Sequence, residues 1–269
     1  MLSDLFAGKF DRYFEQASRG TALWLFVHVP KTAGSSLEVD LATFLKPFAN
    51  ISIDYTDTTK PYQVLLDEAV QRFIATHQQT PYQGAGGHII ARHTQMVRQM
   101  VPDVRCFSML RNPINRLISD YRYQRSDMNL ARDAFIRTTP DFDTYVARKH
   151  VHNKTAIALV PRNLVEEGNI PAAVTHLLEN YTFIGLQEMY PLCVRALTTL
   201  MGNPRAPEAR VRINTAHADQ VVLTPDKEAE LRRLNAVDFG LFNAMMERWK
   251  PIRDDLRAYL AQQKPAKAA

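Results

Sequence analysis

Near-continuous apolar runs alternate with amphipathic segments along this chain. Residues 22–29 (ALWLFVHV), 104–110 (VRCFSML) and 181–186 (YTFIGL) form three such runs. A strand that is covered on both faces of a parallel sheet has this pattern. Each run is followed by apolar residues at helical spacing; after the first run, leucines recur at every fourth position. The alternation predicts an α/β fold with a mostly parallel central sheet flanked by helices.

The two ends of the chain have patterns of their own. Residues 1–20 predict an N-terminal amphipathic helix, and residues 241–249 predict a final helix that packs on the core. Residues 262–269 (QQKPAKAA) predict a flexible tail. The chain has no internal repeat and no linker rich in Gly, Ser or Pro. We therefore expect a single domain over residues 1–269.

The charge balance favours a small anionic ligand over nucleic acid. Lys and Arg number 33 against 28 Asp and Glu, and no block of consecutive basic residues occurs. The apolar runs are far too short for an integral membrane segment, and the charged N-terminus lacks the plan of a signal peptide. Cys106 and Cys193 have neither metal-binding nor disulfide-framework spacing. We expect a cytoplasmic protein that requires no metal.

A short polar loop follows the first strand, with the sequence Pro-Lys-Thr-Ala-Gly-Ser-Ser at residues 30–36. A loop that leads from a strand into a helix directs several backbone N–H groups at one point, where the helix dipole also favours an anion. The lysine adds a cation, the glycine permits close approach, and the hydroxyl groups add donors. An ordinary capped turn with a solvated lysine is the alternative. The candidate residues for binding a phosphate-like group are Lys31, Thr32, Ala33, Gly34, Ser35 and Ser36.

This loop differs from the nucleotide-binding loop of nucleoside triphosphate kinases. In the GxxxxGK[ST] pattern of those enzymes the lysine comes late, whereas Lys31 stands near the start of its loop. Kinase activity is therefore disfavoured.

A second strand-to-helix unit supplies another anion site. Arg111 ends the second apolar run, and Ser119 lies eight residues further along the next helix. Asn112 is a good N-cap and Pro113 a good first helical residue. A forked guanidinium beside a helix start could bind a second phosphate. Arg116 either joins this site or forms a surface ion pair.

The two motifs in this order resemble the sulfotransferases that use 3′-phosphoadenosine 5′-phosphosulfate (PAPS). The resemblance is greatest to the carbohydrate group that includes the uronyl 2-O-sulfotransferases of heparan sulfate. It extends more weakly from Leu25 to Trp249, and Asn112 stands where the family often has aspartate. It implies a P-loop-NTPase-like domain that uses PAPS as sulfuryl donor, without a metal, and releases 3′-phosphoadenosine 5′-phosphate (PAP). Animal members commonly carry a Golgi anchor, and we find no such segment here. We therefore expect a bacterial member, with a trimmed luminal domain as the alternative.

The resemblance also implies roles for individual residues. Lys31 would contact the oxygen that bridges phosphorus and sulfur, and the rest of its loop would line the 5′-phosphate pocket. Arg111 and Ser119 would bind the 3′-phosphate. Arg210 and Arg212 resemble a late loop that closes over the nucleotide.

A histidine is the candidate base for the acceptor hydroxyl, since an imidazole with a pKa near 6.5 suits that task at neutral pH. His88 follows the glycine-rich residues 84–87, which we interpret as a flexible stretch, and resembles the Gly-His step at which the related enzymes place their base. His93 is the reserve candidate. Glu188 follows a core strand, so we expect it to be structural.

The acceptor implied by the resemblance is a hydroxyl of a saccharide. A lipid or a small alcohol is the alternative acceptor, because acceptor loops vary more than cofactor loops. A binding protein that holds a nucleotide without turnover is the alternative from another class. The sequence leaves the oligomeric state open.

Overall fold

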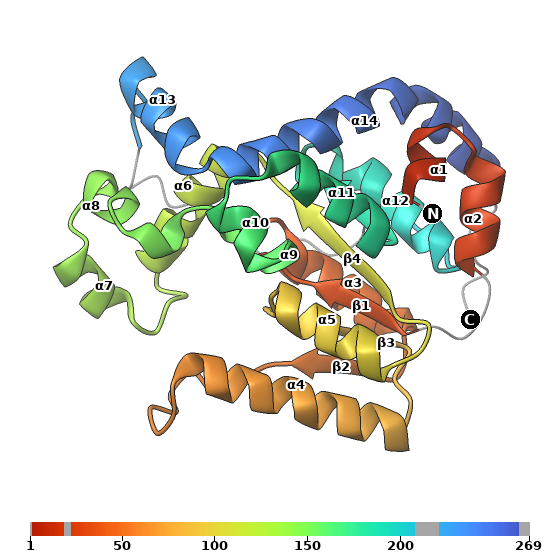
Figure 1. Ribbon diagram of the computed structural model, residues 1–269, viewed down its shortest axis with the longest axis horizontal. Helices are drawn as coiled ribbons and strands as arrows, with labels where there is room; N and C mark the ends of the chain where they lie inside the picture. The colour runs from red at the N-terminus through yellow and green to blue at the C-terminus, as the bar shows by residue number, and fades with distance from the viewer. Residues whose placement is uncertain (1, 19–22, 208–220, 264–269) are drawn as a thin grey trace.

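The computed structural model describes residues 2–18, 23–207 and 221–263. Its centre is a five-stranded, all-parallel sheet with the strand order β2-β3-β1-β4-β5 (Figure 1). The three predicted apolar runs are confirmed as strands. The strands are β1 (Trp24–Val27), β2 (Phe48–Ile51), β3 (Gly84–Gly87), β4 (Arg105–Leu110) and β5 (Phe183–Leu186).

Helices flank this sheet, which confirms the predicted α/β class. In Figure 1, α4 and α5 accompany the β2 and β3 side of the sheet. The long α14 contacts β5 at the opposite edge of the sheet. The helices are α1 (Leu2–Phe6), α2 (Phe10–Ser18), α3 (Gly34–Phe44), α4 (Tyr62–Gln79), α5 (Ala91–Met100), α6 (Pro113–Gln124), α7 (Arg132–Thr138), α8 (Phe142–Val146), α9 (Lys154–Leu159), α10 (Arg162–Glu166), α11 (Ile170–Asn180), α12 (Tyr190–Leu200), α13 (Pro225–Leu234) and α14 (Ala236–Gln262), with 3₁₀ turns η1 (Lys149–Val151) and η2 (Gln187–Met189). Within the described ranges, every helix is too short or too polar to span a membrane.

The glycine-rich stretch is a buried strand, so its interpretation as a flexible segment was wrong. Strand β3 lies between β1 and β2 and all four of its residues are buried. Side chains of β2 occupy the space that larger residues in β3 would need. A Cβ at Gly84 would come within 2.7 Å of Phe48 Cδ2, and a Cβ at Gly87 within 2.3 Å of the Ile51 carbonyl oxygen. Glycine is thus selected here by close packing.

The N-terminal segment forms two helices instead of the single helix predicted. Gly8, at φ 71°, adopts a left-handed conformation that ends α1 and turns the chain into α2. Both helices still bury apolar side chains, including Leu5 and Phe14. The Tyr13 hydroxyl donates a hydrogen bond to the Thr182 carbonyl at 2.8 Å, which ties α2 to the sheet. Residues 264–269, most of the predicted tail, lie outside the described residues.

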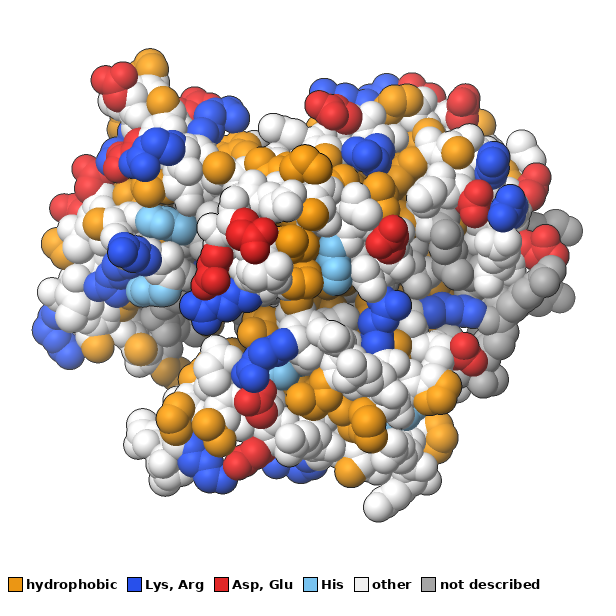
Figure 2. All heavy atoms as spheres, viewed as in Figure 1, with side chains coloured by type: hydrophobic (Ala, Val, Ile, Leu, Met, Phe, Trp, Pro, Cys, Tyr) orange, Lys and Arg blue, Asp and Glu red, His pale blue; other side chains and the backbone are white. Residues whose placement is uncertain are grey.

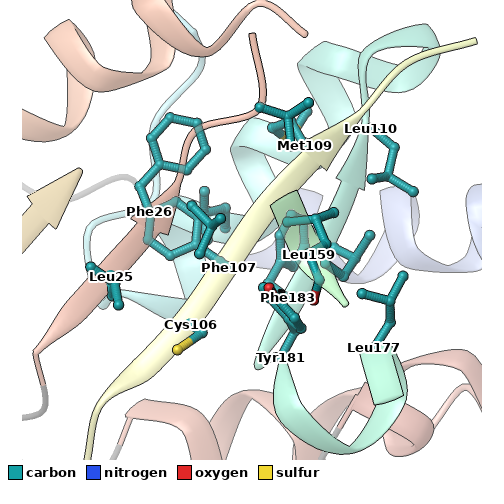
Figure 3. Packing of buried hydrophobic residues seen from close by; sticks show 14 of the residues in the cluster. Leu25, Phe26, Cys106, Phe107, Met109, Leu110, Leu159, Leu177, Tyr181 and Phe183 are labelled. Atoms are coloured by element: carbon teal, nitrogen blue, oxygen red, sulfur yellow. Dashed lines mark hydrogen bonds between the residues drawn. The ribbon is translucent and has the colours of Figure 1, made fainter. Parts of the chain in front are cut away.

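The main core packs around β1, β4 and β5 (Figure 3). The rings of Phe26 and Phe107 stack across neighbouring strands with centroids 5.1 Å apart. The indole N–H of Trp249, on α14, donates to the Ile184 carbonyl at 2.9 Å, so the final helix is bonded to β5. Cys106 lies in this core, where burial raises the pKa of its thiol to about 12. Such a thiol is structural and unreactive.

Candidate functional site

A cavity of about 990 Å³ opens at the carboxyl ends of the parallel strands. The chain passes from β1 to β2 and β3 on one side of β1 and later to β4 on its other side, so this edge is the topological switch point at which ligands bind in such sheets. Loops that follow β1, β3 and β4 line the cavity together with α6 and α9. Among the predicted site residues that line it are Lys31, Ala33, Gly34, Ser35, Ser36, His88, Arg111 and Ser119.

The loop after β1 has an unusual backbone. Lys31 (φ 71°) and Ala33 (φ 66°) both adopt the left-handed conformation, and α3 starts at Gly34. Non-glycine residues hold this conformation at a cost and are found at binding sites. Alternation of left- and right-handed residues turns successive N–H groups into one concavity that suits an anion. Gly34 is required because a Cβ there would lie 2.2 Å from the ring of His28.

Thr32 has a different place from the one predicted. Its side chain is fully buried and does not line the cavity. The hydroxyl donates to the Val29 carbonyl at 2.9 Å, within the same loop. The structure thus contradicts a ligand-facing hydroxyl at Thr32. The residue shapes the loop, while Ser35 and Ser36 line the cavity.

Arg111 connects the two candidate anion-binding motifs. Its guanidinium donates from Nη1 to the Lys31 carbonyl at 3.1 Å. The Asn112 N–H donates to Glu188 Oε1 at 2.8 Å, which confirms a structural contact for that carboxylate. Burial lowers the pKa of Arg111 and the Glu188 carboxylate opposes the effect, so the guanidinium stays charged at neutral pH. The two loops are therefore fixed relative to each other before any ligand binds.

The start of α6 follows the sequence prediction. Asn112 is the N-cap, and its side-chain oxygen accepts from the N–H groups of Ile114 at 3.1 Å and Asn115 at 3.2 Å. Pro113 is the first helical residue. Ser119 lies two turns further along and faces the same cavity as Lys31.

A buried ionic cluster next to the cavity, which the sequence did not predict, joins α6 to its neighbours. Its members are Arg116, Asp120, Tyr145 and Lys154. Arg116 is fully buried, so the interpretation of this residue as a surface ion-pair partner was wrong. Its Nη1 lies 3.5 Å from Asp120 Oδ2. The same oxygen accepts from Lys154 Nζ at 2.9 Å and from the Tyr145 hydroxyl at 2.9 Å. Lys154 and Asp120 also line the cavity.

Replacement of Asp120 with asparagine is expected to destabilise the fold at neutral pH. Burial alone would raise the pKa of Asp120, but Lys154 and Arg116 outweigh it and hold the pKa below its ordinary value. Loss of one partner from a buried ion pair costs about 3–5 kcal/mol. Urea unfolding at pH 7 measures this loss.

The pH dependence of this effect has a defined sign. A carboxyl with a lowered pKa in the folded state stabilises the protein above its unfolded pKa, about 3.9, and loses that contribution as the pH falls through the folded value. The difference between wild type and Asp120→Asn should therefore narrow below about pH 4. Asp127→Asn, at an exposed position, is the matched control and should unfold like wild type. A constant difference across this pH range would contradict the ionic role of Asp120.

His88 lies directly after β3 and lines the cavity. Its Nδ1 is 2.8 Å from the His28 carbonyl oxygen. A carbonyl only accepts, so Nδ1 carries the hydrogen, and Nε2 is the proton-accepting nitrogen of the neutral ring. This is the tautomer that a general base needs if its Nε2 is to meet an acceptor hydroxyl.

His93, the reserve candidate, is held away from the cavity. Its side chain is fully buried near the start of α5. Nε2 bonds to Asp67 Oδ1 at 2.7 Å, and Nδ1 accepts from the Ile90 N–H at 3.3 Å. Burial lowers the pKa of His93, and Asp67 opposes that change. With Nε2 bonded to Asp67 and Nδ1 engaged in capping α5, the geometry contradicts a role as base.

Some cavity residues were missed by the sequence reasoning, and others cannot be placed. Tyr123 lies under Lys31, with Nζ 4.0 Å from the ring centroid. It follows Ser119 by one helical turn, and that spacing was a usable signal. Glu38, one turn after Gly34 on α3, also lines the cavity. Arg210 and Arg212 lie outside the described residues.

A second hollow, of about 1380 Å³, lies between α5 and the α9–α11 segment (Figure 2). At two places, residues close together in the sequence line the two hollows. His88 lines the first cavity whereas Ile90 lines the second, and Lys154 lines the first whereas Ile157 lines the second. The polar lining of the second hollow includes the amide and guanidinium groups of Gln63, Gln95, Gln99, Asn180, Arg92, Arg98 and Arg162, together with Asp67, Thr94, His150, Glu166, His176 and Tyr181.

The overall structure is similar to a crystal structure of a sulfotransferase from Alicyclobacillus acidocaldarius. The comparison gives a TM-score of 0.51 and 18% sequence identity, and it covers 84% of this chain and 95% of that chain. At this identity the likeness shows a shared fold, which confirms the predicted fold class. No protein-family model and no curated protein sequence matches this chain.

Proposed function

We propose that this protein transfers a sulfuryl group from PAPS to a hydroxyl of a saccharide. The hydrogen bond from Arg111 to the Lys31 carbonyl carries the proposal, because it fixes two separate anion-binding loops on one cavity. A nucleotide with phosphate groups on both the 3′ and the 5′ oxygen of its ribose would satisfy both loops. The cavity of about 990 Å³ lies at the upper end of the range for small-molecule sites.

The residues present fit PAPS, which supplies an activated sulfuryl group. The concave backbone at 31–34, with Ser35 and Ser36, would hold the 5′-phosphate. Arg111 and Ser119 would hold the 3′-phosphate. The Lys31 ammonium would neutralise the charge that develops on the departing phosphate oxygen, where a preorganised cation has its largest effect. Tyr123 would hold that ammonium in the cavity.

His88 would act as the general base. The acceptor O–H bond breaks and its proton passes to His88 Nε2, while the acceptor oxygen bonds to sulfur and the bond from sulfur to the phosphate oxygen breaks. By analogy with phosphoryl transfer, positioning and charge stabilisation dominate such a reaction. His88 then releases the proton to solvent. Every proton and bond is accounted for without a metal ion.

The second hollow favours a saccharide over a lipid as acceptor. Amide side chains both donate and accept hydrogen bonds, which matches the many hydroxyl groups of a sugar chain. Its volume exceeds the range for small-molecule sites and suits several sugar units. His88 and Ile90, two residues apart, line the first cavity and the second hollow, so a saccharide chain bound in the second hollow would present one hydroxyl to the base.

A transfer assay with ³⁵S-labelled PAPS tests the proposal. Candidate acceptors are neutral and acidic oligosaccharides, a sterol and a simple phenol, each incubated with the purified full chain. Label in an oligosaccharide supports the proposal, and label in only the sterol or phenol favours the alternative acceptor class. A protein that binds PAP but labels no acceptor would fit the non-catalytic alternative.

A further inference from the structure

His28 contacts the proposed base, His88, and Glu38 in turn contacts His28. The rings of His28 and His88 lie with centroids 4.3 Å apart and an interplanar angle of 38°. His28 Nδ1 is also 3.3 Å from Glu38 Oε2. The three side chains come from the end of β1, the start of α3 and the end of β3. They form a row that runs from the carboxylate to the base.

Packing holds this row in place. His28 is 5% exposed and stacks on Phe26 with centroids 5.1 Å apart. Gly34 contributes no side chain on one flank, where a Cβ would lie 2.2 Å from the His28 ring. At Gly86 a Cβ would lie 2.7 Å from Glu38 Oε1. Two glycines thus leave the space that the imidazole and the carboxylate occupy.

Glu38 has a partner on only one of its carboxylate oxygens, Oε2, in the part of the chain that the structure describes, and that partner is His28. Its Oε1 is buried and, within the described ranges, has no hydrogen-bond partner. The cavity's charged side chains are Lys31, Glu38, Arg111, Asp120 and Lys154, with Tyr55 and Tyr123 also titratable. Asp120 is neutralised by Lys154 and Arg116. Glu38 is therefore the carboxylate that can act on the imidazoles.

We propose that Glu38, acting through His28, positions His88 and stabilises the imidazolium that forms when His88 accepts a proton. The inference rests on the proposed function of His88. The His28 carbonyl fixes the His88 tautomer, and the Glu38 carboxylate supplies negative charge one ring away. Neither Glu38 nor His28 gains or loses a proton in the reaction. Glu38 is a positioning residue, since it acts on the acceptor only through the two rings.

The test follows His88 by NMR in the full chain, with ¹⁵N-labelled histidine and saturating PAP. The His88 signal is assigned by its absence in His88→Asn. Removal of a nearby carboxylate favours the neutral imidazole, so Glu38→Gln should lower the pKa of His88 by about 0.5 to 1. The neutral wild-type ring should carry its hydrogen on Nδ1. Glu68→Gln, an exposed position on α4, is the control and should leave the pKa of His88 unchanged.

The outcomes separate this inference from the proposed function. A pKa of His88 in Glu38→Gln that equals the wild-type value, or a neutral ring protonated on Nε2, would overturn the inference. Failure of wild type to bind PAP would instead count against the proposed function. If Glu38→Gln does not fold, Glu38→Ala removes the carboxylate without leaving a buried amide. A fall in the pKa of His88 in that variant supports the inference, and no fall overturns it.

Discussion

Replacing Lys31 with alanine is expected to lower the turnover of sulfuryl transfer by about 10²–10³-fold, the effect of removing one group that stabilises developing charge. The left-handed backbone at Lys31 and the Tyr123 ring 4.0 Å away hold its ammonium in the cavity. The backbone N–H groups and Arg111 remain in the variant, so PAP affinity should fall much less than turnover. Steady-state kinetics and calorimetric titration with PAP measure the two effects separately.

Lys60→Ala is the matched control for this experiment, because Lys60 lies on the surface and pairs with Glu68. It should behave as wild type in both assays. The opposite result for Lys31→Ala, a large loss of PAP affinity with unchanged turnover at saturation, would show that Lys31 binds the ground state. The leaving-group role would then be wrong.

Replacing His88 with alanine is expected to reduce transfer by about 10²–10⁴-fold, the usual contribution of a general base. PAP affinity should stay close to wild type, because the phosphate-binding groups lie on other loops. The same kinetic and calorimetric measurements apply.

His88→Asn separates loss of the base from loss of structure. The asparagine amide can still donate to the His28 carbonyl, as Nδ1 does at 2.8 Å, but it cannot accept a proton at neutral pH. We expect this variant to be as inactive as His88→Ala. Recovery of activity in His88→Asn would show that the residue serves only to position the loop, and unchanged turnover in His88→Ala would exclude it as the base.

The strands that carry their own hydrophobic signal were predictable from sequence. Residues 22–29, 104–110 and 181–186 contain β1, β4 and β5 because these strands are buried on both faces and their residues are mostly apolar. Strand β3 carried no such signal. Its four residues are Gly, Ala, Gly and Gly, and its burial arises from the side chains of β2 and α3 that fill the space around it.

In the candidate site, too, features set by a few consecutive residues were predictable, and features that depend on contacts between distant segments were not. The loop at 30–36 and the N-cap at Asn112 were predictable because each is set by a few consecutive residues. The cluster around Asp120 joins α6, α8 and α9, and no local pattern reveals that Arg116 and Lys154 share one carboxylate oxygen. His93 was the reserve candidate in sequence, and only the fold shows that it is buried and bonded to Asp67 on α4.

The most direct test of the account is calorimetric titration of the full chain with PAP, 5′-AMP and ATP, with Arg111→Ala alongside. The account predicts a clear preference for PAP, because Arg111 and the loop at Lys31 each meet one phosphate, and predicts that Arg111→Ala loses this preference. Equal binding of PAP and 5′-AMP, no binding of PAP, or a preference that survives in Arg111→Ala would contradict it.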